Sequence, residues 1–137
     1  MMEQQNNMTP VQSALKIEPV VFDDLSFHRE GFEKSDVQTS IGVSKQVQKI
    51  SDGQYRVTVQ VVAERKGVYV AKVQISGFCS IDESLENKDV LLNSNAVAIL
   101  FAYVRSQLTL LTAQPGTEPI VLPVMNIAKM LEESEKK

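Results

Sequence analysis

The sequence predicts an α+β fold in which a four-stranded antiparallel sheet is followed by a long helix and a short second helix. Apolar and polar residues alternate through most of the chain up to about residue 82, which is the period of strands buried on one face. From about residue 94 an apolar helical pattern replaces this alternation. Strands that precede helices favour an α+β domain over a parallel α/β sheet. A helix this apolar must be covered on more than one side, so the sequence also predicts an oligomer.

The first expected strand is the least regular of the four. Its apolar residues of one parity are Leu15, Ile17, Val21, Leu25 and Phe27. Pro19 interrupts them, and because proline has no N–H group to donate, this strand is expected at a sheet edge or with a bulge. Residues 30–35 then form a loop that crosses to the second strand.

The second and third strands are expected to form a hairpin whose loop is residues 51–53. Gly53 then takes the left-handed position that such loops require. Lys45 is the one misfit on the apolar face of the hairpin. The pairs that result are Val47 with Val57 and Val43 with Val61.

The third and fourth strands, residues 55–64 and 69–81, are expected to pair in the register that keeps one apolar face. A two-residue loop would place Val61 opposite Lys72, so a three-residue loop of residues 65–67 is favoured. The predicted pairs are Val57 with Ile75, Val59 with Val73 and Val61 with Ala71.

The long helix is expected to be capped by Ser94 or Asn95 and to end before Pro115-Gly116. The apolar stripe that covers the sheet is Val97, Leu100, Phe101, Val104, Leu108 and Leu111. A strip of small or hydroxyl side chains around one charge lies roughly opposite and is the expected contact with a helix of a second copy. This strip is Ala98, Ala102, Arg105, Thr109 and Thr112.

Residues 120–123 are expected to form an extended linker, because prolines stand at both sides of the apolar segment. A short second helix follows over residues 125–134. Residues 11–131 therefore form one domain, between a flexible polar N-terminus (1–10) and a charged C-terminal tail (132–137).

Bulk composition narrows the classes of function. The 137 residues carry a net charge of −3, which argues against a nucleic-acid-binding surface. No segment resembles a signal peptide, and the apolar helix is interrupted by polar residues, so no membrane insertion is expected. The single cysteine, Cys79, excludes an internal disulfide and fits a reducing cytoplasm.

Four short motifs resemble those of the SecB-type protein-export chaperone family. Residues 99–105, ILFAYVR, resemble that family's I-L-F-P-Y-A-R run, with Ala102 in place of proline. Residues 76–81 resemble its G-G-I-F-S-I strand end, and residues 25–27 resemble its I-S-F. Residues 122–127 resemble the A-P-V-N-F that precedes its second helix. The resemblance runs in order over roughly residues 16–131.

The resemblance implies a homotetramer, built as a dimer of dimers, that holds unfolded preproteins in apolar grooves without ATP. It also implies delivery to the export ATPase SecA through acidic side chains on the outer face of the sheet. Asp24 matches one of those acidic positions, whereas His28 and Lys72 stand where the family tends to have glutamate. Docking to SecA is therefore an open expectation, and a chaperone dedicated to one client, such as an antitoxin, is the alternative.

Aromatic and aliphatic residues in three segments are candidates for a client-binding groove. A core role is the competing interpretation for each of them, and a small apolar ligand is a further alternative occupant. The candidates are Phe22, Phe27, Phe32, Tyr69, Val73, Ile75, Ile127, Met130 and Leu131.

No catalytic, metal or cofactor site is predicted. His28 lies near Asp23 and Asp24, but no serine or cysteine nucleophile has a spacing that supports catalysis, so a solvated histidine is expected. Cys79 falls on the buried parity of its strand, which favours packing over reactivity. No metal-ligand spacing and no glycine-rich phosphate loop is present.

Overall fold

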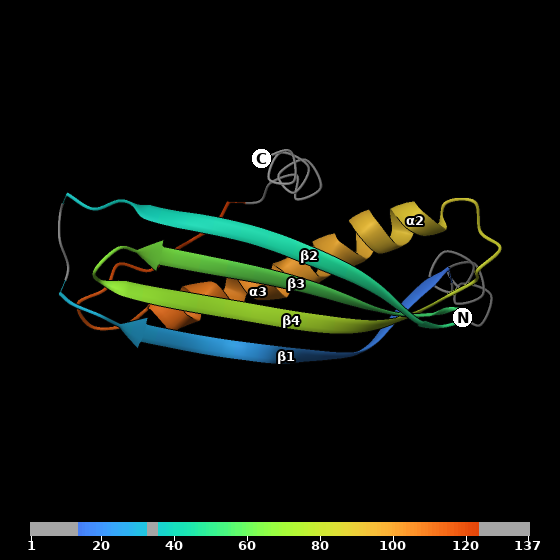
Figure 1. Cartoon of the computed structure of the whole chain (residues 1–137), viewed down its shortest axis with the longest axis horizontal. Helices are drawn as coiled ribbons and strands as arrows, with labels where there is room; N and C mark the ends of the chain where they lie inside the picture. The colour runs from blue at the N-terminus through green and yellow to red at the C-terminus, as the bar shows by residue number, and fades with distance from the viewer. Residues whose placement is uncertain (1–13, 33–35, 124–137) are drawn as a thin grey trace, which may run out of the picture.

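The computed structural model describes residues 14–32 and 36–123. Four strands form one antiparallel sheet in the order β1-β4-β3-β2, and a helical segment lies diagonally across one of its faces (Figure 1). The predicted α+β architecture of sheet and long helix is confirmed. The strands are β1 (Leu15–Arg29), β2 (Thr39–Ser51), β3 (Gln54–Arg65) and β4 (Tyr69–Ile81). The helical parts are α2 (Lys88–Val90), a π-helical turn η1 (Leu91–Ala96) and α3 (Val97–Thr112).

The predicted second helix and both predicted termini lie outside the described residues. So do three of the candidate groove residues, Ile127, Met130 and Leu131.

The β2–β3 hairpin has the predicted register. Val47 pairs with Val57 and Val43 with Val61. Gly53 has a φ of 74°, which is the left-handed conformation expected for the turn. A register irregularity between Lys49 and Ser51 shortens the turn by letting Ser51 pair with Gln54.

The predicted β3–β4 register is wrong by two residues. Val59 pairs with Ile75 instead of Val73, and the loop is residues 66–68 instead of 65–67. The physical reason is Val68, which is fully buried in the core while its N–H donates to the carbonyl of Arg65 at 2.8 Å. Gly67 has a φ of 77°, which is the left-handed conformation that such a turn requires. A shift of two leaves every side chain on its predicted face.

The expected parity of β1 is also wrong in its middle. Two bulges, between Ile17 and Val20 and between Phe22 and Asp24, change which residues face the helix. Phe22 thus takes the core side that Val21 was expected to take, and Val21 is 40% exposed. Leu25 pairs with Val73 on the helix side of the sheet but is 45% exposed, because α3 packs mainly on β4 and β3.

The helix begins earlier than predicted. It starts at Lys88, and neither Ser94 nor Asn95 caps it, because both lie within the helical segment. Leu92 and Ala96 extend the buried apolar stripe towards its start. Lys45, the predicted misfit on the apolar face, reaches this turn and donates hydrogen bonds to the backbone and side-chain oxygens of Asn93 at 3.4 and 3.3 Å.

The core lies between α3 and the valine-rich face of the two central strands. Val57, Val59 and Val61 of β3 have no exposed surface, nor do Leu100, Val104 and Leu108 of α3. Gly77 of β4 lets the helix approach, since a Cβ atom there would lie 3.0 Å from Leu100 and 2.8 Å from Ile17. A larger residue at this position would require the side chains of Leu100 and Ile17 to shift.

Glu83 joins the start of the helix to the β2–β3 hairpin. Its carboxylate accepts hydrogen bonds from the N–H of Gly53 at 2.6 Å, from the Tyr55 hydroxyl at 2.9 Å and from Lys88 at 2.9 Å. Lys49 lies 3.3 Å from the same carboxylate. The hydrogen bond from Gly53, followed by that from Lys88, lowers the pKa of Glu83 to about 2. One carboxylate therefore ties together the turn, the strand and the helix.

The Glu83→Gln variant is expected to lose stability at neutral pH and to converge on the parent chain in acid. The carboxyl has a pKa of about 2 in the folded chain against an ordinary value of 4.5, so its contribution is complete above pH 4.5. That contribution disappears as the pH falls from 4.5 towards 2. Urea denaturation at a series of pH values measures the difference. Glu86→Gln, an exposed change in the same loop, is the control. If the Glu83→Gln variant remained less stable than the parent chain near pH 2, the stabilising role of the Glu83 carboxylate would be contradicted.

Candidate functional site

After α3 the chain turns back along the helix and runs on the same side of the sheet towards β2 (Figure 1). We call residues 117–123 the return segment. Its backbone is held by the helix: Thr112 Oγ1 accepts a hydrogen bond from the N–H of Ile120 at 2.8 Å, and Thr109 Oγ1 donates to the carbonyl of Ile120 at 2.7 Å. Arg105 Nε donates to the carbonyl of Leu122 at 3.0 Å.

Side chains of the return segment alternate between core and solvent. Leu122 is 9% exposed and Ile120 packs against the core, whereas Val121 between them is 72% exposed. Such alternation is that of an extended strand. The helix therefore binds an extended, apolar piece of polypeptide through the backbone.

The strip predicted as a contact between copies divides into two parts. Arg105, Thr109 and Thr112 contact the return segment of their own chain, and Thr112 is fully buried. Ala98 and Ala102 are exposed. Large apolar side chains are exposed on the same helix: Ile99 (48%), Tyr103 (48%) and Leu110 (65%). An apolar helix surface thus remains uncovered in the single chain.

The described candidates for the client groove fall into three environments. Tyr69, Val73 and Ile75 are buried core residues. Phe22 and Phe27 are half-buried on β1. Phe32 is 87% exposed just after β1. The structure therefore does not bring all of them onto one surface.

Phe27 links the exposed end of β1 to the core. Its ring stacks on Tyr69 with centroids 4.9 Å apart, and the guanidinium of Arg29 lies 5.4 Å from the Phe27 centroid. Arg29 also donates to the hydroxyl of Thr117 in the return segment. At this end of β1, Leu25 and Phe27 lie on the side of the sheet that their parity predicted, because the second bulge reverses the change made by the first, and Leu25 is exposed there.

A small hollow of about 170 Å³ lies between the return segment and the sheet. Tyr69 forms part of it, and Ile120 closes it from the return segment. Its lining is Thr39, Arg65, Tyr69, Glu118, Pro119 and Ile120. The return segment is therefore one wall of a cavity whose other wall is the end of the sheet.

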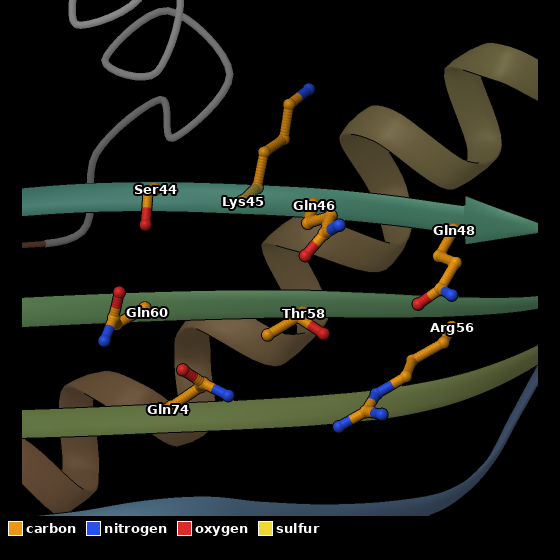
Figure 2. A pocket seen from close by; sticks show the side chains of 8 residues that line it. All are labelled: Ser44, Lys45, Gln46, Gln48, Arg56, Thr58, Gln60 and Gln74. Atoms are coloured by element: carbon orange, nitrogen blue, oxygen red, sulfur yellow. The ribbon is translucent and has the colours of Figure 1, made fainter.

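The face of the sheet opposite the helix is polar (Figure 2). A shallow hollow of about 420 Å³ lies there, and four glutamines contribute to it. Lys45 points away from the other side chains of the group, in keeping with its contact to Asn93. The lining residues are Ser44, Lys45, Gln46, Gln48, Arg56, Thr58, Gln60 and Gln74.

Asp23 organises one side of this polar face. It stands at the second β1 bulge, and its carboxylate accepts hydrogen bonds from Arg56 at 3.1 Å and from Ser76 at 2.5 Å. Ser76 is fully buried and also bonds to Thr58 at 3.0 Å. From the sequence, Asp23 was expected only to lie near His28. Its role as a cross-strand anchor depends on the bulge and has no local sequence signal.

The described residues contain no group of three or more side chains suited to hold a metal ion. Burial raises the pKa of the Cys79 thiol to about 11, so the thiolate required for nucleophilic chemistry is disfavoured. Across residues 14–32 and 36–123, no helix is both long and apolar enough to cross a membrane.

Comparison with known proteins identifies the family. The model of the family described as preprotein translocase subunit SecB matches residues 8–137. The chain belongs to the SecB family. Protein-export protein SecB of Xanthomonas oryzae pv. oryzae is 28% identical over 131 residues, which cover 88% of this chain and 77% of that protein. The family resemblance stated from the four motifs is thereby confirmed.

Two further relatives extend the comparison. An uncharacterized protein of Methanocaldococcus jannaschii is 36% identical over 70 residues, which are 50% of this chain and 44% of that protein. The solved structure of a SecB-like chaperone of Mycobacterium tuberculosis, in complex with a ChAD peptide from an antitoxin, is similar with a TM-score of 0.66. That similarity covers 90% of this chain and 96% of the other at 10% identity, and it supports the fold.

Replacing Thr112 with valine is expected to loosen the return segment. The change keeps the shape of the side chain but leaves the N–H of Ile120 without its acceptor, which costs about 1–3 kcal/mol of unfolding free energy. Hydrogen exchange at the Ile120 amide and urea denaturation measure the two effects. Ser106→Ala, which removes an exposed hydroxyl from the same helix, is the control, and equal effects of the two changes would refute the contact.

Proposed function

We propose that this chain is an ATP-independent chaperone that holds unfolded preproteins for export. The observation that carries the proposal is the match of residues 8–137 to the SecB family. The geometry agrees with it, since the chain exposes apolar side chains beside a sheet. The proposal requires no cofactor and no catalytic step, and it places the chain in the cytoplasm.

The proposed client surface begins at the end of β1. Leu25 and Phe32 are exposed there, and Phe22 and Phe27 supply half-buried apolar surface on the same strand. Apolar side chains without shape-specific polar partners suit clients of varied sequence. Of the residues first considered, Tyr69, Val73 and Ile75 support this surface from the core, and Ile127, Met130 and Leu131 remain proposed members.

The proposed assembly uses the uncovered surface of α3. Ile99 and Tyr103 are about half exposed beside the small residues Ala98 and Ala102, so a second helix is able to approach closely. Two copies related by a twofold axis would cover this surface on both. We propose a dimer or tetramer on this basis.

Docking to SecA remains a proposal with a specific difficulty. The polar face of the sheet carries glutamines, and Asp23 is engaged by Arg56 and Ser76. Lys72 and His28 reduce the negative charge expected of an acidic docking face. A chaperone dedicated to one client, such as an antitoxin, fits the same fold, and co-purification of one dominant protein would distinguish it.

Suppression of aggregation tests the chaperone activity. We expect the chain at stoichiometric amounts to reduce light scattering by reduced insulin, because exposed insulin segments bind its apolar surface. Replacing Leu25 and Phe32 together by serine is expected to weaken this protection by about tenfold or more in the concentration required, since two exposed apolar contacts are lost. Val90→Ser, which also replaces an exposed apolar side chain but lies at the start of the helix, is the control. No protection by the parent chain would end the proposal.

Light scattering coupled to size exclusion tests the assembly. We expect the parent chain to elute as a dimer or tetramer at micromolar concentration and Tyr103→Lys to elute as a smaller species, because a charge would be buried without a partner. Gln48→Lys introduces the same charge on the polar face of the sheet and is expected to leave the mass unchanged. A monomeric parent chain, or a Tyr103→Lys variant of unchanged mass, is incompatible with this interface.

A further inference from the structure

Arg105, Thr109 and Thr112 form a row on one face of α3 that binds the backbone of an extended segment. The spacing of four and three residues places the side chains one helical turn apart. We propose that this row is a binding site for the backbone of an extended client, and that the return segment occupies it until a client displaces it. This inference rests on the proposed chaperone function.

Every bond in this site goes to a backbone group. Ile120 presents its N–H to Thr112 and its carbonyl to Thr109, and Leu122 presents its carbonyl to Arg105. All residues except proline carry both groups, so the same row is able to hold segments of unrelated sequence. This is the property that a chaperone with many clients needs.

The side-chain pattern of the occupant defines what the site selects. Ile120 and Leu122 face the core, and Val121 faces solvent with 72% of its surface exposed. An extended client with apolar residues at alternate positions reproduces this pattern. The site therefore selects an apolar-x-apolar segment whose first residue is not proline, because the N–H of that residue bonds to Thr112.

The return segment is suited to leave the site. Pro119 and Pro123 lie within it on either side of residues 120–122, and neither proline has an N–H group to strengthen attachment to the helix. Residues 118–123 form neither helix nor strand, and Ile120 is only half-buried. A client that supplies equivalent backbone groups and apolar side chains replaces each lost contact, so the exchange leaves no buried donor unsatisfied.

Hydrogen exchange on the full-length parent chain gives the most direct test. The probe is an unstructured peptide with isoleucine or leucine at alternate positions, and the control peptide has serine at those positions. Binding of the probe is expected to accelerate exchange of the Ile120 amide by about tenfold or more, because its N–H loses Thr112 as acceptor. The control peptide is expected to leave the exchange rate unchanged.

Affinity for the same peptide, measured by fluorescence anisotropy, supplies a second readout. Ile120→Ala removes apolar contacts of the return segment without changing the helix, so the state in which this segment occupies the row is less populated. Peptide binding is therefore expected to tighten by about fivefold. Val121→Ala is the matched control in the same segment, because this side chain faces solvent, and its affinity is expected to equal that of the parent chain.

The outcomes separate this inference from the chaperone proposal. Peptide binding with faster Ile120 exchange and a tighter Ile120→Ala variant supports both. Peptide binding with unchanged or slower Ile120 exchange, or with weaker binding by Ile120→Ala, shows that the return segment is a fixed wall and overturns only the displacement. Absence of peptide binding by the parent chain overturns the chaperone proposal and this inference with it.

Discussion

The packing of one long apolar helix on one face of a four-stranded sheet is the constraint on which the structure depends. The two central strands supply a continuous apolar surface, and Gly77 lets the helix approach it closely. Polar contacts then fix the two ends of the helix. Lys45 and Glu83 tie its beginning to the hairpin side of the sheet, and the row of Thr112, Thr109 and Arg105 ties its end to the return segment.

The faces of the strands were predictable because a period of two depends only on local sequence. The β3–β4 register was less accessible, since a shift by two residues leaves each residue on the same face and differs mainly in the burial of Val68. The bulges of β1 could not be predicted from the sequence either. Each inserts a residue that reverses the later parity, so Phe22 and Val21 exchange the sides expected from a regular strand. Tertiary pairing decides such features.

The candidate site illustrates a different limit. Apolar composition does not separate a core residue from a binding residue, and Ile75 and Phe32 were grouped although one is buried and the other exposed. The strip that contains Arg105 and Thr109 was recognised as unusual from helical spacing. Its contact with the return segment was not identified, because hydroxyl and guanidinium groups offer the same hydrogen bonds to any backbone. Only the path of the chain after Pro115-Gly116 shows that the backbone they bind belongs to the same chain.

The buried cysteine has a consequence for the chemistry of client handling. An unfolded polypeptide that carries a disulfide is open to attack by a thiolate on a binding protein, which would form a mixed disulfide and release the other sulfur as a thiolate. Cys79 is fully buried, and its pKa of about 11 keeps it protonated at neutral pH. Its thiol therefore does not take part in thiol–disulfide exchange. Any association with a cysteine-bearing polypeptide through the described surfaces stays noncovalent, so release needs no reductant.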